Sequence, residues 1–196
     1  MTNASPNQTT VLLDSLTFPE GPRWRDDRLW FSDFYSHTVI ATDVQGNSEN
    51  IIEIPGQPSG LGWTPDGQLL VVSMTDRRLL RLDPDGLTEV ANLSNFADYH
   101  CNDMVVDDDG GAYVGNFGFN SHAGEPFRPA NLIHINPDGT PSVAATNLAF
   151  PNGSVITPDG RTLIVAETRG HVLSAWDRAS NGSLSNRRIW ADLNGG

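Results

Sequence analysis

The chain has 196 residues, with 12 basic and 24 acidic side chains and a net charge of −12. This acidic balance, without a basic cluster, argues against nucleic acid and anionic membranes as partners. No apolar run approaches the roughly 20 residues that span a bilayer, and a single cysteine, Cys101, excludes an internal disulfide. We therefore expect a cytoplasmic protein with a disordered polar tail at residues 1–10 and one domain at residues 11–196.

Four copies of one pattern follow one another along the chain. Each copy begins with a polar side chain, here called the slot residue; the four are Glu20, Ser59, Asn102 and Asn152. An aspartate follows seven residues later in every copy, at Asp27, Asp66, Asp109 and Asp159. Aspartate and glycine between apolar segments are typical of hairpin turns, because both tolerate left-handed backbone conformations. We therefore expect each slot residue on the first strand of a hairpin.

Three apolar segments follow the slot in each copy and predict three further strands. In chain order they are 29–31, 38–43 and 51–54, then 69–72, 79–86 and 88–93, then 112–114, 132–139 and 143–148, then 163–166, 172–177 and 189–193. The slots are 39, 43 and 50 residues apart. Four short strands in about 40 to 50 residues are typical of a β-propeller blade. The predicted fold class is all-β, with four propeller blades.

The N-terminal segment predicts one more strand. Residues 11–20 align without gaps on residues 143–152, which hold the fourth strand of the third copy and the next slot. Propellers close their ring with such a strand, because an open sheet edge is otherwise exposed. We therefore expect four blades plus this closing strand, in a chain that is truncated before a fifth slot. The longest irregular stretch, 117–129, is either a functional lid or a surface insertion.

The slot residues are also candidate metal ligands. The first strand of each propeller blade lines the central channel, so Glu20, Asn102 and Asn152 would face one another around its axis. Their carboxylate and amide oxygens suit Ca²⁺, with Mg²⁺ or Mn²⁺ as lesser options, and not Zn²⁺, which prefers His and Cys. Taken alone, each asparagine could instead be a turn residue at the strand entry, and Glu20 could be a solvated carboxylate. Their equivalent positions in three copies favour a metal site. His100 flanks Asn102 and could reach a substrate at the channel mouth.

Three motifs carry a resemblance to a known family. They are Pro19-Glu20-Gly21-Pro22-x-Trp24, Asn102-Asp103-Met104-Val105-Val106-Asp107-x-x-Gly110 and Pro151-Asn152-Gly153. In this order they resemble the senescence-marker-protein/gluconolactonase (SGL, regucalcin-like) family over about residues 12–196. The resemblance implies a six-bladed β-propeller with one divalent cation, usually Ca²⁺ or Zn²⁺, that hydrolyses sugar lactones or related esters.

By motif match, the resemblance implies that Glu20 and Asn152 are metal ligands and that Asn102 is a ligand or a substrate contact. The family's acid/base aspartate is expected beyond Gly196, so no catalytic residue is assigned within the chain, and its own activity is left open. His100 replaces the arginine that contacts sugar lactones, which weakens the case for a gluconate-type substrate. The expected partner is a small-molecule lactone or ester. The alternative is a non-enzymatic propeller that binds a ligand or partner around a structural calcium ion.

Overall fold

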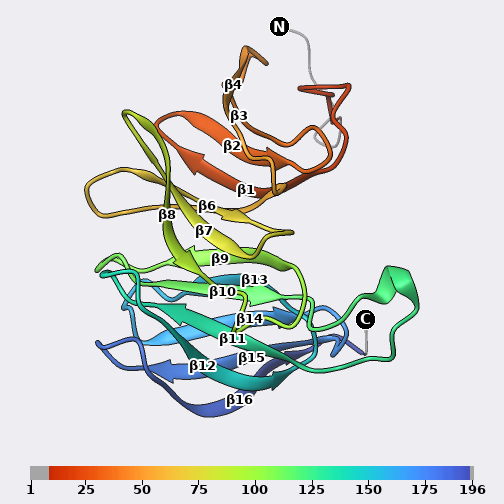
Figure 1. The fold of residues 1–196 in the computed structure, drawn as a ribbon, viewed down its shortest axis with the longest axis vertical. Helices are drawn as coiled ribbons and strands as arrows, with labels where there is room; N and C mark the ends of the chain where they lie inside the picture. Colours follow the sequence, from red (N-terminus) through yellow and green to blue (C-terminus); the bar gives the residue numbers. More distant parts are fainter. Residues whose placement is uncertain (1–8, 195–196) are drawn as a thin grey trace, which may run out of the picture.

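The computed structural model describes residues 9–194, which form four antiparallel sheets of four strands each. The sheets follow one another along the chain and stack side by side (Figure 1). The first two are β1 (Pro19–Arg25), β2 (Arg28–Asp33), β3 (Thr38–Thr42) and β4 (Ser48–Glu53), then β5 (Pro58–Trp63), β6 (Leu69–Ser73), β7 (Arg78–Asp83) and β8 (Gly86–Asn92). The last two are β9 (Cys101–Val106), β10 (Ala112–Asn116), β11 (Ala130–Ile135) and β12 (Pro141–Leu148), then β13 (Pro151–Ile156), β14 (Thr162–Glu167), β15 (Val172–Arg178) and β16 (Leu184–Asp192). The prediction of four propeller blades is confirmed.

The predicted hairpin after each slot is also confirmed. Each sheet is a meander in which consecutive strands pair, and the four aspartates that follow the slots lie in the turns between first and second strands. In the first blade, both residues of the two-residue turn, Asp26 and Asp27, have a positive φ (52° and 57°). This left-handed conformation is what a tight hairpin turn with the natural strand twist requires.

The apolar core lies between neighbouring blades. One cluster, which includes Val39, Leu61 and Val71, joins the first two blades; a second joins the middle pair and a third joins the last two. Every residue of β6 is buried, whereas most of the outer strand β16 is exposed. The second strands β6 and β10 of the middle blades are buried throughout, because neighbouring blades cover both of their faces, whereas β14 of the last blade is alternately buried and partly exposed.

The innermost strands β1, β5, β9 and β13 contact one another in that order. The contact between β5 and β9 depends on Gly60, because a Cβ atom there would lie 2.4 Å from the backbone nitrogen of Met104. Real Cβ atoms essentially never approach so closely. Glycine at this position therefore lets the two strands meet backbone against backbone beside the channel axis.

Two segments lie outside the sheets. The predicted closing strand is not formed, because residues 9–18 pair with none of the four sheets, and a strand needs a partner for its backbone hydrogen bonds. Most of the predicted disordered tail, residues 1–8, lies outside the described residues.

The long connection between β10 and β11 holds a short 3₁₀ helix, Ser121–Ala123, and projects away from the sheets (Figure 1). Within residues 9–194, no helix is long and apolar enough to cross a membrane.

Candidate functional site

The slot residues occupy equivalent places in the four blades. Each is the second residue of an innermost strand, in β1, β5, β9 and β13. A cavity of about 400 Å³ is lined by three of them, Glu20, Asn102 and Asn152, and by His100. The structure therefore brings the sequence-predicted residues around one cavity. The fourth slot residue, Ser59, is buried and reaches Glu20, whose carboxylate accepts a 2.7 Å hydrogen bond from the Ser59 hydroxyl.

Glu20 places a negative charge in a poorly hydrated part of the channel. Burial raises the pKa of this carboxyl, and the nearby charge of Asp103 raises it further, whereas the Ser59 hydroxyl and the Arg23 guanidinium act in the opposite direction. The net effect is a raised pKa. A carboxylate whose charge is disfavoured in this way is stabilised when a cation binds beside it.

Asn102 has a carboxamide that the fold holds in place. The side chain is 2% exposed, and its Nδ2 group donates a 2.9 Å hydrogen bond to the backbone carbonyl of Pro151. Its Oδ1 atom is buried and has no hydrogen-bond partner in the part of the chain that the structure describes. Gly115 makes room for this group, because a Cβ atom there would lie 2.5 Å from Oδ1 and 2.4 Å from the Pro151 oxygen.

These donors fit a hard divalent cation. A buried oxygen without a partner needs an explanation in a native structure, and amide and carboxylate oxygens are the ligands that Ca²⁺ prefers. Asn152 is less buried, and its Nδ2 group donates a 3.3 Å hydrogen bond to the Thr168 hydroxyl, so its amide oxygen remains available. Within residues 9–194, no three His, Cys, Asp or Glu side chains are grouped so that they could hold a metal ion by themselves. A metal here would rest on amide oxygens beside one carboxylate.

The residues two positions before the slots also line this cavity. They are Phe18, Gln57, His100 and Phe150, here called the mouth residues. Each of them stands one position before an innermost strand, so a second ring of equivalent side chains follows the first. Sequence reasoning singled out only His100 from this ring. The spacing of two would have found the other three.

Two buried carboxylates hold the chain that carries the mouth residues. Asp33, at the end of β2, accepts hydrogen bonds from the backbone N–H groups of Phe18 (2.7 Å) and Thr17 (3.0 Å). Glu167, at the end of β14, accepts a 2.7 Å hydrogen bond from the N–H of Ala149, next to Phe150. Both carboxylates therefore position the segments that enter β1 and β13.

His100 is held among aromatic rings. It stacks on Tyr99, with ring centroids 3.9 Å apart and an angle of 14° between the planes. Burial lowers the pKa of His100, and the charges of Arg77 and His122 lower it further. The long connection after β10 also reaches the cavity, because Phe117 and His122 are among its lining residues.

Sequence reasoning missed one ion pair in the channel. Arg23 of β1 donates a 2.8 Å hydrogen bond to the carboxylate of Asp103 on β9. Burial raises the pKa of Asp103, and the Arg23 guanidinium opposes that shift. The other three copies have no basic residue three positions after the slot, so the repeat did not predict this ion pair. The single arginine at this position, Arg23, was the one feature of the sequence that could have indicated it.

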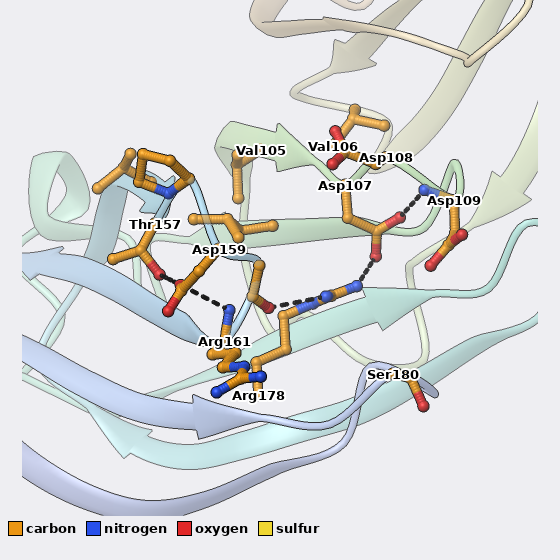
Figure 2. A pocket seen from close by; sticks show the side chains of 14 residues that line it. Val105, Val106, Asp107, Asp108, Asp109, Thr157, Asp159, Arg161, Arg178 and Ser180 are labelled. Carbon is orange, nitrogen blue, oxygen red and sulfur yellow. Dashed lines mark hydrogen bonds and ion pairs between the residues drawn. The ribbon is translucent and has the colours of Figure 1, made fainter.

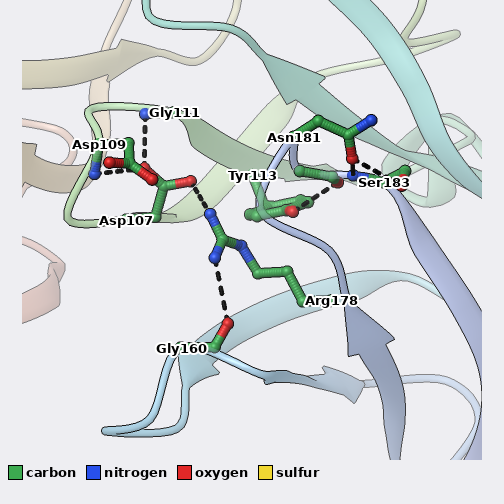
Figure 3. Close-up of polar contacts among 9 residues, drawn as sticks. Asp107, Asp109, Gly111, Tyr113, Gly160, Arg178, Asn181 and Ser183 are labelled. Carbon is green, nitrogen blue, oxygen red and sulfur yellow. Dashed lines mark hydrogen bonds and ion pairs between the residues drawn. The ribbon is translucent and has the colours of Figure 1, made fainter.

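The largest cavity lies elsewhere, between the third and fourth blades. It measures about 690 Å³ (Figure 2), and several of its polar groups bind one another. Asp107 accepts hydrogen bonds from the N–H groups of Asp109 and Gly111 and forms a buried ion pair with Arg178, which also donates to the Gly160 carbonyl (Figure 3). These contacts join the turns of two blades. We therefore assign them a structural role and place the candidate site at the slot residues.

Comparison with known families identifies the family of the chain. The family described as SMP-30/Gluconolactonase/LRE-like region matches residues 18–196. The chain belongs to this family. The matched region of the SMP-30/gluconolactonase/LRE-like chain begins at Phe18, the first mouth residue, and includes all four slots.

Solved structures with the same fold have related descriptions. A luciferin-regenerating enzyme superposes with a TM-score of 0.78 at 18% identity, over 92% of this chain and 62% of the other. A gluconolactonase from Xanthomonas campestris gives 0.77 at 24% identity, over 94% and 66%. A calcium-binding regucalcin from Agrobacterium tumefaciens gives 0.77 at 20% identity, over 94% and 63%. At these identities the likeness concerns the fold, and the SMP-30/gluconolactonase/LRE-like chain spans about two thirds of the length of these proteins.

Proposed function

We propose that this chain forms the cation-binding and substrate-binding part of a hydrolase that acts on lactones or related esters. Glu20, Asn102 and Asn152 would hold one divalent cation, with Ca²⁺ the first choice and Mg²⁺, Mn²⁺ or Zn²⁺ as alternatives. One observation carries the proposal. Oxygen-bearing side chains from three different blades line a single cavity, and one of their oxygens, Asn102 Oδ1, is buried without a partner.

The comparisons support the proposal from another direction. The chain belongs to the SMP-30/gluconolactonase/LRE-like family. Two of the proteins that share its fold are described as a gluconolactonase and as a calcium-binding regucalcin. Both descriptions concern those proteins, and they motivate the choice of lactones and of calcium for the experiments on this chain.

Each residue of the site would have a separate role in binding the cation or the substrate. Glu20, fixed by the Ser59 hydroxyl, supplies the negative charge that draws a cation into the channel. Asn102 and Asn152 supply neutral amide oxygens, which leave much of the cation's charge uncompensated. A divalent cation bound there supplies Lewis-acid polarisation of a substrate carbonyl. The mouth residues would enclose the remainder of the substrate and exclude water from it.

A hydrolysis assay with a panel of lactones and esters tests this function. The chain is assayed as purified, after treatment with a chelator, and after Ca²⁺, Mg²⁺, Mn²⁺ or Zn²⁺ is added back. We expect a cation to stabilise the chain against thermal unfolding, and we expect any turnover to be abolished by the chelator and restored by the cation. Turnover that persists in excess chelator would contradict the metal role. Cation-dependent thermal stabilisation without turnover of any compound would instead identify a binding module with a structural ion.

A further inference from the structure

The wall of the candidate cavity is dominated by aromatic rings. On the first blade, Phe18, Phe34 and Tyr35 form one cluster, with centroid distances of 5.6 Å between the two phenylalanines and 5.1 Å between Phe34 and Tyr35. On the third and fourth blades, Phe117 and Phe150 stack with centroids 4.5 Å apart and an angle of 22° between the planes. All five rings line the same cavity.

The backbone of Phe150 is adapted to this arrangement. Its φ is 66°, which is uncommon for a bulky residue and is costly unless the surroundings enforce it. The mouth residue Gln57 has the same conformation, with a φ of 65°. In both cases a proline follows, and the slot residue comes next. The fold therefore accepts strain just where the mouth residues enter the cavity.

The wall also carries polar side chains, on Glu20, Gln57, His100, Asn102, His122 and Asn152, but the phenylalanine rings cannot pair with the hydroxyl groups of a sugar. Among the described residues, no arginine lines the cavity. The Glu20 carboxylate already accepts a hydrogen bond from Ser59, and the Asn102 Nδ2 group already donates to Pro151. A sugar ring placed against the phenylalanine rings would lose hydrogen bonds to water that these rings cannot replace, and such unpaired polar groups are strongly disfavoured.

We propose that the substrate of this site is a lactone or ester that carries an apolar ring, and that Phe117 and Phe150 are the residues that select it. This inference rests on the proposed function of the cavity and names its substrate class. The apolar ring would lie against the stacked pair, since aromatic rings favour such offset or edge contacts. The reactive carbonyl would then point toward the slot residues.

Two neutral lactams that resist hydrolysis test the selection without requiring turnover. One is the aryl-fused 3,4-dihydroquinolin-2-one, and the other is the polyhydroxylated glucono-δ-lactam. Binding of each to the full chain is measured by isothermal titration calorimetry in the presence of Ca²⁺. We expect the aryl lactam to bind at least about tenfold more tightly, which is the gain that partial burial of one aromatic ring provides.

Substitutions then test whether Phe117 and Phe150 cause the preference for the aryl lactam. Phe117→Ala is expected to weaken binding of the aryl lactam about tenfold and to leave the sugar lactam unchanged. Phe150→Leu is the second variant and should give a smaller loss in the same direction. Phe127→Ala is the matched control, because Phe127 belongs to the same long connection, is exposed, and packs edge-on against Phe119 outside the cavity. Thermal unfolding of each variant shows that it is folded.

The outcomes separate this inference from the proposed function. Equal affinity for the two lactams, or tighter binding of the sugar lactam, would overturn the inference even if the chain hydrolyses sugar lactones. An unchanged preference in both Phe117→Ala and Phe150→Leu would also overturn it. Selective binding of the aryl lactam that both variants lose would support it, even if the hydrolysis assay shows no turnover and the proposed reaction fails.

Discussion

Arg23 and Asp103 meet across the channel, where the guanidinium donates to the carboxylate at 2.8 Å and to the neighbouring Met104 carbonyl at 2.7 Å. The first residue belongs to the innermost strand of the first blade and the second to that of the third blade. The contact therefore joins two sheets that are not consecutive in the chain. It also compensates the charge of Asp103, a side chain with little exposure to water.

Removal of Arg23 should destabilise the fold. In Arg23→Met the buried Asp103 carboxylate loses its partner, and we expect the free energy of unfolding to fall by about 3 kcal/mol. Urea unfolding at neutral pH measures the change. Arg28→Met is the control, because Arg28 pairs with the exposed Glu49 and should cost about 1 kcal/mol or less. Equal effects of the two substitutions would show that the cross-channel pair is no more important than a surface pair.

Glu20→Gln should abolish stabilisation by calcium. If the wild-type chain binds Ca²⁺ at the slot residues, a concentration one hundred times the dissociation constant adds about 2.7 kcal/mol of stability. The variant keeps the size of the side chain and loses its charge, so the melting temperature should no longer respond to the ion. Glu49→Gln, at an exposed position, should respond like wild type. A full calcium response in Glu20→Gln would rule out this carboxylate as a ligand.

Gly115→Ala should disturb the amide of Asn102. The added methyl group would lie 2.5 Å from Oδ1 of Asn102, so either the carboxamide or strand β10 must shift. We expect a loss of about 2 kcal/mol from overpacking, together with a weaker response to calcium. Gly153→Ala is the comparison, since its methyl group would meet only Asp103 Oδ2 at an ordinary 3.9 Å. If both variants behave alike, Gly115 does not determine the position of Asn102.

Asp33→Asn should lower stability at neutral pH and have less effect in acid. Desolvation raises the pKa of Asp33, but the hydrogen bonds from Phe18, Ser36 and Thr17 outweigh it and lower the pKa below its ordinary value. A lowered pKa in the folded state contributes stability above the unfolded-state pKa, and this contribution is lost as the pH falls through the folded-state pKa.

The expected loss for Asp33→Asn at pH 7 is about 1–3 kcal/mol, the usual cost of weakening buried hydrogen bonds to a charged group. Urea unfolding at a series of pH values measures the difference between wild type and variant, which should shrink as the carboxylate protonates. A difference that stays constant with pH would mean that Asp33 contributes through packing rather than through its charge.

The repeat explains why so much of the fold could be predicted from the sequence. Four aligned slots and their following aspartates placed the first hairpin of every blade, because the turn residues recur at one spacing. The same register predicted that Glu20, Asn102 and Asn152 share one space, and they line one cavity. Whether they bind a metal stays a prediction.

Features that break the repeat could not be predicted in the same way. Arg23 occurs in a single copy, and its partner lies 80 residues away. The role of Gly115 depends on the backbone of Pro151 in the next blade, a contact that no local pattern records. The closing strand at residues 11–20 was predicted from its likeness to residues 143–152. A sequence likeness does not supply the neighbouring strand to which such a segment must bond.

Gly60 has a consequence for the width of the channel. The second and third blades meet there through two main chains, with Met104 on the other side, so no rotamer change can bring them closer. A closer approach of these two blades would require a shift of the main chain. The side chains at the entrance can change rotamer without such a shift, so a ligand is accommodated there at a lower cost than beside Gly60.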